Sequence, residues 1–412
     1  MVRARVVEYV IAALISTFPL ACLAQPPSSC DQAEVVRTAT RVQSVRKQLL
    51  NLPIGDGPGV SPAAQQEIVS MKSALAALID AYMGCVSSQP DGTKVRNELS
   101  ALTNAFELPQ GQVLTAEQIP AEFGKFGFEL WFDVRAIQNP RLIGITANFS
   151  IECGGDTVLL VFAPKADTWE EVLRWQKQPY PEVDGGTMAF GYEISPPDNS
   201  GGWFLVEHDI APWCSSTWSS IRYSVLKPTS EPLQPKVLFS GDDYMWWGSE
   251  DYGRLTVDKN AFDLRFHSSS IDAGVHNRVW IRHFSVIGDE VKRTQPVAVS
   301  PRDFVDEWIV SPWEQAAQWS SKAVEADLRR LHELVRAINE DSLLEYTSVH
   351  RCSKPAGHYQ VEVGEYIPPD YRHSRSFYFQ VTANDTYFMT KASRTPDPRC
   401  KGRNILEEMS TR

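Results

Sequence analysis

The chain has 412 residues and carries 51 Asp and Glu against 40 Lys and Arg, a net charge of −11 at pH 7. Nucleic acids and anionic membrane surfaces bind proteins through clustered Lys and Arg, so the acidic balance argues against both as main partners. The length is sufficient for two or three domains, each with a hydrophobic core.

The start of the chain has the composition of a secretory signal peptide. Arg3 and Arg5 are followed by an apolar stretch at 9–18, and the segment ends in the small-residue sequence at 22–24. This order of a basic start, an apolar centre and a small-residue cleavage site predicts that 1–24 is removed on export. We therefore expect a secreted or periplasmic protein.

Two other interpretations of this segment stay open. A retained membrane anchor needs about 20 apolar residues, and Glu8 and Pro19 bracket a shorter stretch than that. A lipid anchor on Cys22 usually has Leu three residues before the cysteine, where Pro19 stands here. No later stretch is apolar for long enough to span a bilayer, so we expect a soluble mature protein without a transmembrane segment.

The cysteines indicate a disulfide-stabilised protein. Cys22 lies in the predicted signal peptide, and an even number then remains: Cys30, Cys85, Cys153, Cys214, Cys352 and Cys400. An even set suits an oxidising compartment. Because each consecutive pair falls within one predicted structural unit, we favour the pairs 30–85, 153–214 and 352–400.

Residues 25–106 are predicted to form a helical hairpin domain. Apolar residues recur at helical spacing over 35–49, and a Gly- and Pro-rich break follows. Ser61 and Pro62 then provide a cap and a first-turn proline for a second amphipathic helix. A tight link between two such helices predicts an antiparallel pair, and a third short helix is expected at 94–106.

Residues 107–299 are predicted to form an antiparallel β-rich domain. Apolar and polar residues alternate at 145–152, which is typical of a half-buried strand, while 157–163 is almost entirely apolar and predicts a strand buried on both faces. The sequence at 168–171 has the form of a capping box and predicts one short helix. Further strands are expected at 187–194, 202–207, 220–226, 236–239, 262–267 and 278–286. Their turn-rich connections favour sandwich- or barrel-like sheets.

Residues 300–342 return to a helical pattern and are predicted to be a connector. Strand-like segments follow at 358–363, 376–381 and 386–391. They make a predicted small C-terminal β unit, 343–412, whose ends Cys352 and Cys400 would cross-link. The predicted fold class is therefore α+β, with a helical hairpin, a mostly antiparallel β domain, a helical connector and a small β unit.

The densest group of acidic and aromatic residues lies between 241 and 253. Its candidate ligand-binding residues are Asp242, Asp243, Trp246, Trp247 and Tyr252. Trp and Tyr can stack on a sugar ring while carboxylates accept hydrogen bonds from its hydroxyl groups. The alternative is a hairpin turn whose aromatic residues pack inward.

A second candidate is the pair Glu207 and Asp209, which share one face of a predicted strand. Such a pair can hold calcium or serve in acid–base catalysis, or it can be the solvated end of a strand. His267, His276 and His283 lie on adjacent candidate strands, so binding of a metal by three histidines is geometrically possible. Spacing across strands is not a metal-binding motif, and we expect neither a metal nor another cofactor.

Motifs of several enzyme classes are absent from the sequence, which contains no H-E-x-x-H, C-x-x-C, G-x-S-x-G or Walker A pattern. No catalytic residue is assigned. We therefore favour an exported non-enzymatic protein that binds a small molecule, a glycan or a protein partner. The alternatives are an exported hydrolase that uses carboxylates of the β domain with a nearby histidine, and a structural envelope component.

Overall fold

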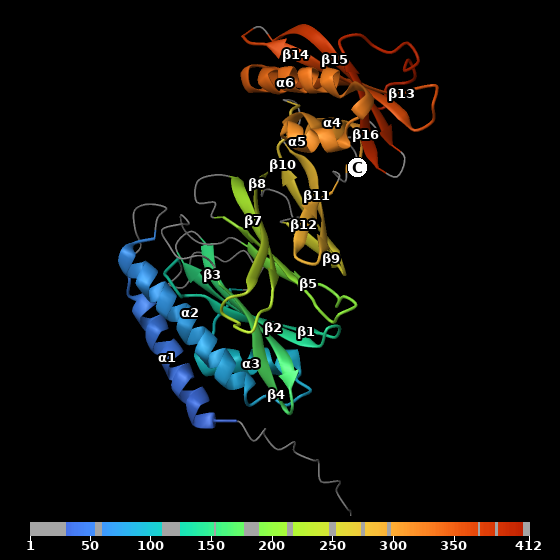
Figure 1. Ribbon diagram of the computed structural model, residues 1–412. Coiled ribbons are helices and arrows are strands. Elements are labelled where there is room, and N and C mark those ends of the chain that lie inside the picture. Colours follow the sequence, from blue (N-terminus) through green and yellow to red (C-terminus); the bar gives the residue numbers. More distant parts are fainter. Residues whose placement is uncertain are drawn as a thin grey trace, which may run out of the picture.

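The computed structural model describes residues 30–53, 60–108, 124–151, 154–176, 189–211, 217–246, 253–272, 277–294, 298–369, 371–383 and 386–406. Within these ranges the chain forms six α-helices and sixteen strands, and the strands make four antiparallel sheets of four strands each. Each sheet is built from consecutive strands in chain order, and we call them sheets A to D. The fold is thus mixed, with strands in the majority (Figure 1).

The described chain opens with three helices, α1 (Gln32–Leu50), α2 (Pro62–Met83) and α3 (Gly92–Thr103). Each begins where the side chain of Asp31, Ser61 or Asp91 accepts a hydrogen bond from a backbone N–H of the first turn. As predicted, α1 and α2 lie side by side and share a hydrophobic core (Figure 1). The Cys30–Cys85 disulfide joins the start of α1 to the end of α2, and it is one of the pairs favoured from the sequence.

Sheet A consists of β1 (Leu130–Ile137), β2 (Leu142–Ile151), β3 (Gly154–Lys165) and β4 (Thr168–Gln176). One face packs on the helices, and the other packs on sheet B. Val158 and Leu160 of β3 face the helices. Leu159 and Val161 face sheet B. The strand is therefore buried on both faces, as its continuous apolar sequence predicts.

The short helix predicted at 168–171 is wrong, because this segment begins β4. Trp169 and Leu173 are four residues apart, a spacing that suits one face of a helix. In the strand, Val172 forms a bulge that adds one residue opposite β3. The bulge turns Trp169 toward the helices and Leu173 toward sheet B, so both are buried without a helix.

Sheet B consists of β5 (Ala189–Ile194), β6 (Leu205–Ile210), β7 (Trp218–Lys227) and β8 (Lys236–Trp246). Sheet C consists of β9 (Arg254–Asp258), β10 (Ala261–Ser268), β11 (Arg278–Ile287) and β12 (Glu290–Arg293). The two sheets share a core that includes Val206 and Ile221 of sheet B and Phe266 and Phe284 of sheet C. Sheet B therefore packs on sheet A with one face and on sheet C with the other. The cysteine pair predicted at 153 and 214 lies outside the described residues.

The C-terminal part combines helices α4 (Pro301–Val310), α5 (Trp313–Ala316) and α6 (Glu325–Asp341) with sheet D, whose strands are β13 (Leu343–Arg351), β14 (His358–Ile367), β15 (Arg372–Ala383) and β16 (Tyr387–Ser393). The helices pack on the sheet, where Trp308 and Phe377 are fully buried (Figure 1). The segment 300–342, expected to be a connector, thus shares one core with the strands that follow it. The Cys352–Cys400 disulfide, also favoured from the sequence, ties the chain after β13 to the chain after β16.

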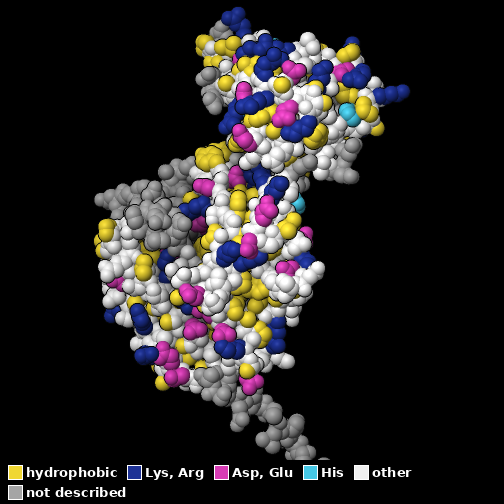
Figure 2. Space-filling view, in the orientation of Figure 1, with side chains coloured by type: hydrophobic (Ala, Val, Ile, Leu, Met, Phe, Trp, Pro, Cys, Tyr) yellow, Lys and Arg dark blue, Asp and Glu magenta, His cyan; other side chains and the backbone are white. Residues whose placement is uncertain are grey.

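None of the described helices is both long and apolar enough to cross a membrane. On the face shown in Figure 2, positive and negative side chains are interspersed over the C-terminal part and over the sheets beside it. Mixed charge of this kind is the usual state of a solvated surface. The features that point to a ligand lie between the sheets instead.

Candidate functional site between sheets A and B

The ligand-binding group predicted from the sequence begins on a strand, β8. Neighbouring residues of a strand point to opposite faces. Asp242 faces sheet A and Asp243 faces sheet C, so these two carboxylates are separated by the sheet. Trp246 ends the strand and is half-buried, and Trp247 and Tyr252 lie outside the described residues. The predicted group is therefore divided between two faces.

Asp243 belongs to a buried ion-pair network between sheets B and C. Its carboxylate accepts hydrogen bonds from Arg282 Nη2 at 2.5 Å, from Arg282 Nε at 3.0 Å and from Tyr223 Oη at 2.9 Å. Arg282 also donates to Glu307 of α4 at 2.5 Å. Asp243 thus helps to hold helix α4 on the sheets, which is a structural role.

The opposite face of the same strands carries two rows of polar side chains, Glu207, Ser224 and Ser240 in one row and Asp209, Arg222 and Asp242 in the next. Together with Trp175 and Gln176 at the end of β4, these residues line a cavity of about 330 Å³, which we call the carboxylate pocket. A cavity of this size suits a small ligand. The strand register thus brings Asp242 to the carboxylates of Glu207 and Asp209.

Asp209 and Arg222 form a bidentate ion pair in the carboxylate pocket. Arg222 Nη2 lies 2.6 Å from Asp209 Oδ2, and Arg222 Nε lies 3.1 Å from Asp209 Oδ1. Asp242 accepts a hydrogen bond from Ser220 Oγ on the neighbouring strand. Because Arg222 balances the charge of Asp209, Asp242 supplies the remaining negative charge of this row.

Glu207 is the unusual member of the pocket, because it is a carboxyl group only 3 % exposed. The side chains of Ser224 and Trp175 hydrogen-bond to it. Its Oε2 atom is buried and has no hydrogen-bond partner in the described part of the chain. Burial, and the negative charge of Asp209 beside it, raise the pKa of Glu207 to about 8. Glu207 therefore carries a proton at neutral pH and provides a buried O–H donor.

His208 lies between Glu207 and Asp209 in the sequence but on the opposite face of sheet B. It packs against Gly191 and Gly253, and a Cβ atom at Gly191 would lie 2.4 Å from His208 Cε1. Glycine is needed at 191 because the imidazole ring fills the space of a side chain. Among the described residues that line the carboxylate pocket there is no histidine, so hydrolysis with a nearby histidine gains no support.

The three histidines considered as metal ligands are only partly described. His267 Nδ1 lies 3.1 Å from Asn277 Oδ1, and His283 Nδ1 hydrogen-bonds with Asp263. His276 lies outside the described residues. Within the described ranges, no group of three or more His, Cys, Asp and Glu side chains is placed to hold a metal ion.

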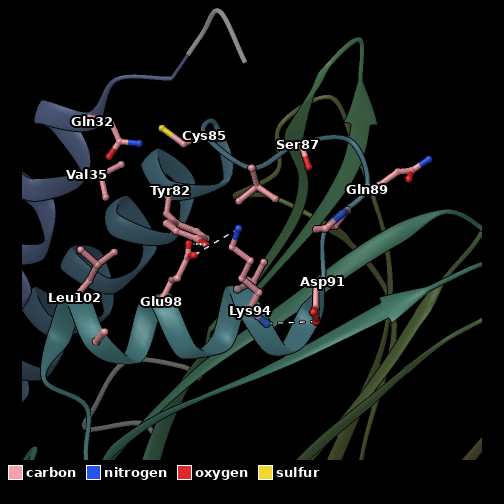
Figure 3. A pocket seen from close by; sticks show the side chains of 14 residues that line it. Gln32, Val35, Tyr82, Cys85, Ser87, Gln89, Asp91, Lys94, Glu98 and Leu102 are labelled. Atoms are coloured by element: carbon pink, nitrogen blue, oxygen red, sulfur yellow. Dashed lines mark hydrogen bonds and ion pairs between the residues drawn. The ribbon is translucent and has the colours of Figure 1, made fainter. Parts of the chain in front are cut away.

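A different cavity, of about 690 Å³, lies among α1, α2 and α3. Figure 3 shows that Tyr82, Lys94 and Glu98 point toward one another there. Tyr82 Oη donates a hydrogen bond to Glu98, and Lys94 Nζ lies 3.8 Å from the same carboxylate. These polar groups satisfy one another, whereas Glu207 keeps an atom without a partner among the described residues. The carboxylate pocket is therefore the better-supported site for a polar ligand.

The sequence interpretation missed Arg222, Ser224 and Trp175. A signal for the first two was present, because Ser220, Arg222 and Ser224 alternate with apolar residues along β7 and so share one face. The register that sets Arg222 opposite Asp209 depends on pairing between strands, which no local pattern shows. Trp175 reaches the pocket from a different sheet.

Comparison of the chain with protein-family models, with curated protein sequences and with solved structures yields no match. The function therefore has to be inferred from the geometry of the carboxylate pocket and the elements around it.

Proposed function

We propose that the protein is an exported, disulfide-stabilised binding protein that holds a small, uncharged, hydroxylated ligand in the carboxylate pocket. The observation that carries this proposal is the buried carboxyl group of Glu207, whose Oε2 has no partner among the described residues. A buried polar group left without a hydrogen bond costs about 1–3 kcal/mol. A ligand hydroxyl that accepts a hydrogen bond from Glu207 removes this cost, so occupancy of the pocket is favoured.

The rest of the pocket suits hydroxyl groups better than an anion. Ser240 and Arg222 supply donors, and Asp242 supplies acceptors for hydroxyl hydrogens. The negative charge of Asp242 opposes the binding of an anion. Trp175 contributes an indole ring at the wall, and such a ring can pack on the apolar face of a sugar.

Hydrolysis is a second candidate function, favoured by the protonated state of Glu207. Glycoside hydrolysis uses one protonated carboxyl group beside one carboxylate, and Glu207 with Asp209 beside it resembles that pair. Asp209, however, accepts hydrogen bonds on both oxygens from Arg222, which makes it a weak base or nucleophile. We therefore rank binding above catalysis.

Isothermal titration calorimetry with glucose, N-acetylglucosamine, xylitol and glycerol, at pH 6 and pH 9, tests the proposal. The wild type should bind at pH 6 and weaken at pH 9, because ionised Glu207 no longer donates a hydrogen bond. Glu207→Gln keeps an N–H donor and should bind at both values, whereas Glu207→Ala should bind weakly at both. The exposed Glu290→Gln serves as the control.

Three results would contradict the binding proposal. They are undiminished binding by Glu207→Ala, a preference for the anion glucuronate over glucose, and no binding of any of the four compounds. Release of product by the wild type from chromogenic glycosides, lost in Asp209→Asn, would instead support the hydrolase.

A further inference from the structure

A second group of polar side chains lies between sheets A and B, and we call it the polar grid. It comprises Trp131 and Asp133 of β1, Thr146 and Asn148 of β2, and Thr157 of β3. Trp131, Asn148 and Thr157 lie opposite one another in one row across the sheet. Asp133 and Thr146 form the next row. Because they occupy alternate positions of paired strands, all five residues share the face of sheet A that turns toward sheet B.

The polar grid is the floor of a cavity of about 500 Å³ whose opposite wall includes Phe190 and Tyr192 of β5. Farther along the same face of sheet A, Leu142, Leu159 and Val161 pack on sheet B in a hydrophobic core. The side chains thus change from apolar to polar where close packing gives way to a cavity. Polar groups that converge on a cavity beside an apolar wall are typical of a ligand site.

Hydrogen bonds within the polar grid fix the orientation of three of its side chains. Thr157 Oγ1 donates to Asn148 Oδ1 at 2.7 Å, and Asn148 Nδ2 donates to Thr146 Oγ1 at 3.2 Å. An amide nitrogen carries two hydrogens, so Asn148 can donate a second hydrogen bond to a ligand. Side chains that are oriented in advance lose less conformational entropy on binding.

Two stacked aromatic rings separate the polar grid from the carboxylate pocket. Phe190 lines the cavity over the polar grid, and Trp175 lines the carboxylate pocket. Their ring centroids are 4.5 Å apart, with an angle of 25° between the planes. The two cavities are therefore neighbours on either side of one aromatic pair, between the same two sheets.

We propose that the polar grid is a second subsite, and that the ligand is an uncharged carbohydrate chain long enough to occupy both cavities. The inference rests on the proposed function, because one end of the chain occupies the carboxylate pocket. Asp133 and Asn148 provide the acceptors and donors that neighbouring sugar hydroxyls require, and Trp131 provides a ring for stacking. Arg135 lines the same cavity and balances the charge of Asp133 in an ion pair, so the carboxylate of Glu129 is the one that opposes an acidic polysaccharide.

The test is calorimetric titration with cello-, chito- and malto-oligosaccharides of one to six units, because the natural sugar is unidentified. Affinity for at least one series should rise tenfold or more with length and then level off when both cavities are filled. Trp131→Ala and Asn148→Ala should each lower the affinity for the hexasaccharide of that series at least tenfold. Tyr371→Ala, which removes an aromatic residue that is 59 % exposed in the turn between β14 and β15, is the matched control and should change nothing. Circular dichroism verifies that each variant is folded.

The outcomes separate this inference from the proposed function. Equal affinity for one unit and six units, together with loss of binding in Glu207→Ala, overturns the second subsite and leaves the carboxylate pocket standing. Glu207-dependent binding of xylitol or glycerol without binding of any saccharide overturns the carbohydrate assignment. Loss of binding in Trp131→Ala with no effect of Glu207→Ala overturns the proposed function, and the spanning ligand with it.

Discussion

Glu207→Gln should change how the stability of the protein depends on pH. Gln has nearly the same size and can still hydrogen-bond to Ser224 and Trp175, but it does not titrate. The pKa of Glu207 is raised by burial to about 8 from an ordinary value of 4.5. Between these two values the folded protein holds a proton that the unfolded chain has lost, so folding takes up a proton.

The direction in which the free energy of unfolding changes with pH follows from proton linkage. Since the folded state binds more protons, the free energy of unfolding falls as pH rises from about 4.5 toward 8, by about 1.4 kcal/mol per pH unit at most. The contribution of Glu207 is complete below pH 4.5 and is lost once the pH exceeds 8. Over the whole window the loss is on the order of 5 kcal/mol. In the Gln variant this part of the pH dependence should vanish.

Urea unfolding at pH 5, 6, 7 and 8, followed by tryptophan fluorescence, measures the effect. The difference in unfolding free energy between Glu207→Gln and the wild type should move in favour of the variant as pH rises. Glu290→Gln, at an exposed position of β12, should run parallel to the wild type. If Glu207→Gln also runs parallel to the wild type over this range, Glu207 does not hold a proton in the folded state, and the argument for the carboxylate pocket fails.

Three further changes test other parts of the fold. Trp308→Ala leaves a cavity in the core beneath sheet D and should lower the unfolding free energy by about 3–5 kcal/mol. Trp308→Phe should lower it less. Equal losses in the two variants would contradict the central place of Trp308 in that core. Asp243→Ala leaves the buried guanidinium of Arg282 short of a partner and should cost about 3–5 kcal/mol, more than Asp243→Asn, as measured by urea unfolding. Replacing Cys30 and Cys85 by Ser opens a loop of 55 residues and should cost about 4 kcal/mol; an unchanged unfolding midpoint would refute this.

The sequence predicts best the elements whose ends and buried faces are determined by residues close by in the chain. The second helix begins at Ser61 and Pro62 as predicted, because a capping hydroxyl and a first-turn proline act within a few residues. β9 (Arg254–Asp258) was missed, since it is a short edge strand whose apolar face consists only of Leu255 and Val257. β13 was missed because Thr347 forms a bulge that interrupts the period-two alternation.

The candidate site was predictable only in part, for a similar reason. Strand periodicity alone places Glu207 and Asp209 on one face. The addition of Asp242 and Arg222 requires the pairing of three strands, which depends on distant turns and on packing against sheet A. The raised pKa of Glu207 depends on its burial, and burial is a property of the assembled sheets rather than of the local sequence.

Helix α4 shows that ion pairs with residues distant in the sequence can bury a helix whose own sequence indicates exposure. Its sequence at 301–308 contains four charged residues among eight, which by itself indicates an exposed helix. In the structure the helix is buried, and its charges meet arginines of β11: Asp306 lies 3.3 Å from Arg278, and Glu307 lies 2.5 Å from Arg282. Buried carboxylates of this kind are tolerated only because each has a cationic partner.

The guanidinium of Arg282 also connects the C-terminal part to the carboxylate pocket. Arg282 holds both Glu307 of α4 and Asp243 of β8. Asp243 is adjacent to Asp242, which lines the pocket on the other face of the strand. A strand held on one face by an ion pair resists displacement on the other, so the network keeps Asp242 in place beside Arg222. The buried charges of α4 therefore serve two purposes, because they anchor the C-terminal sheet and stiffen one wall of the pocket.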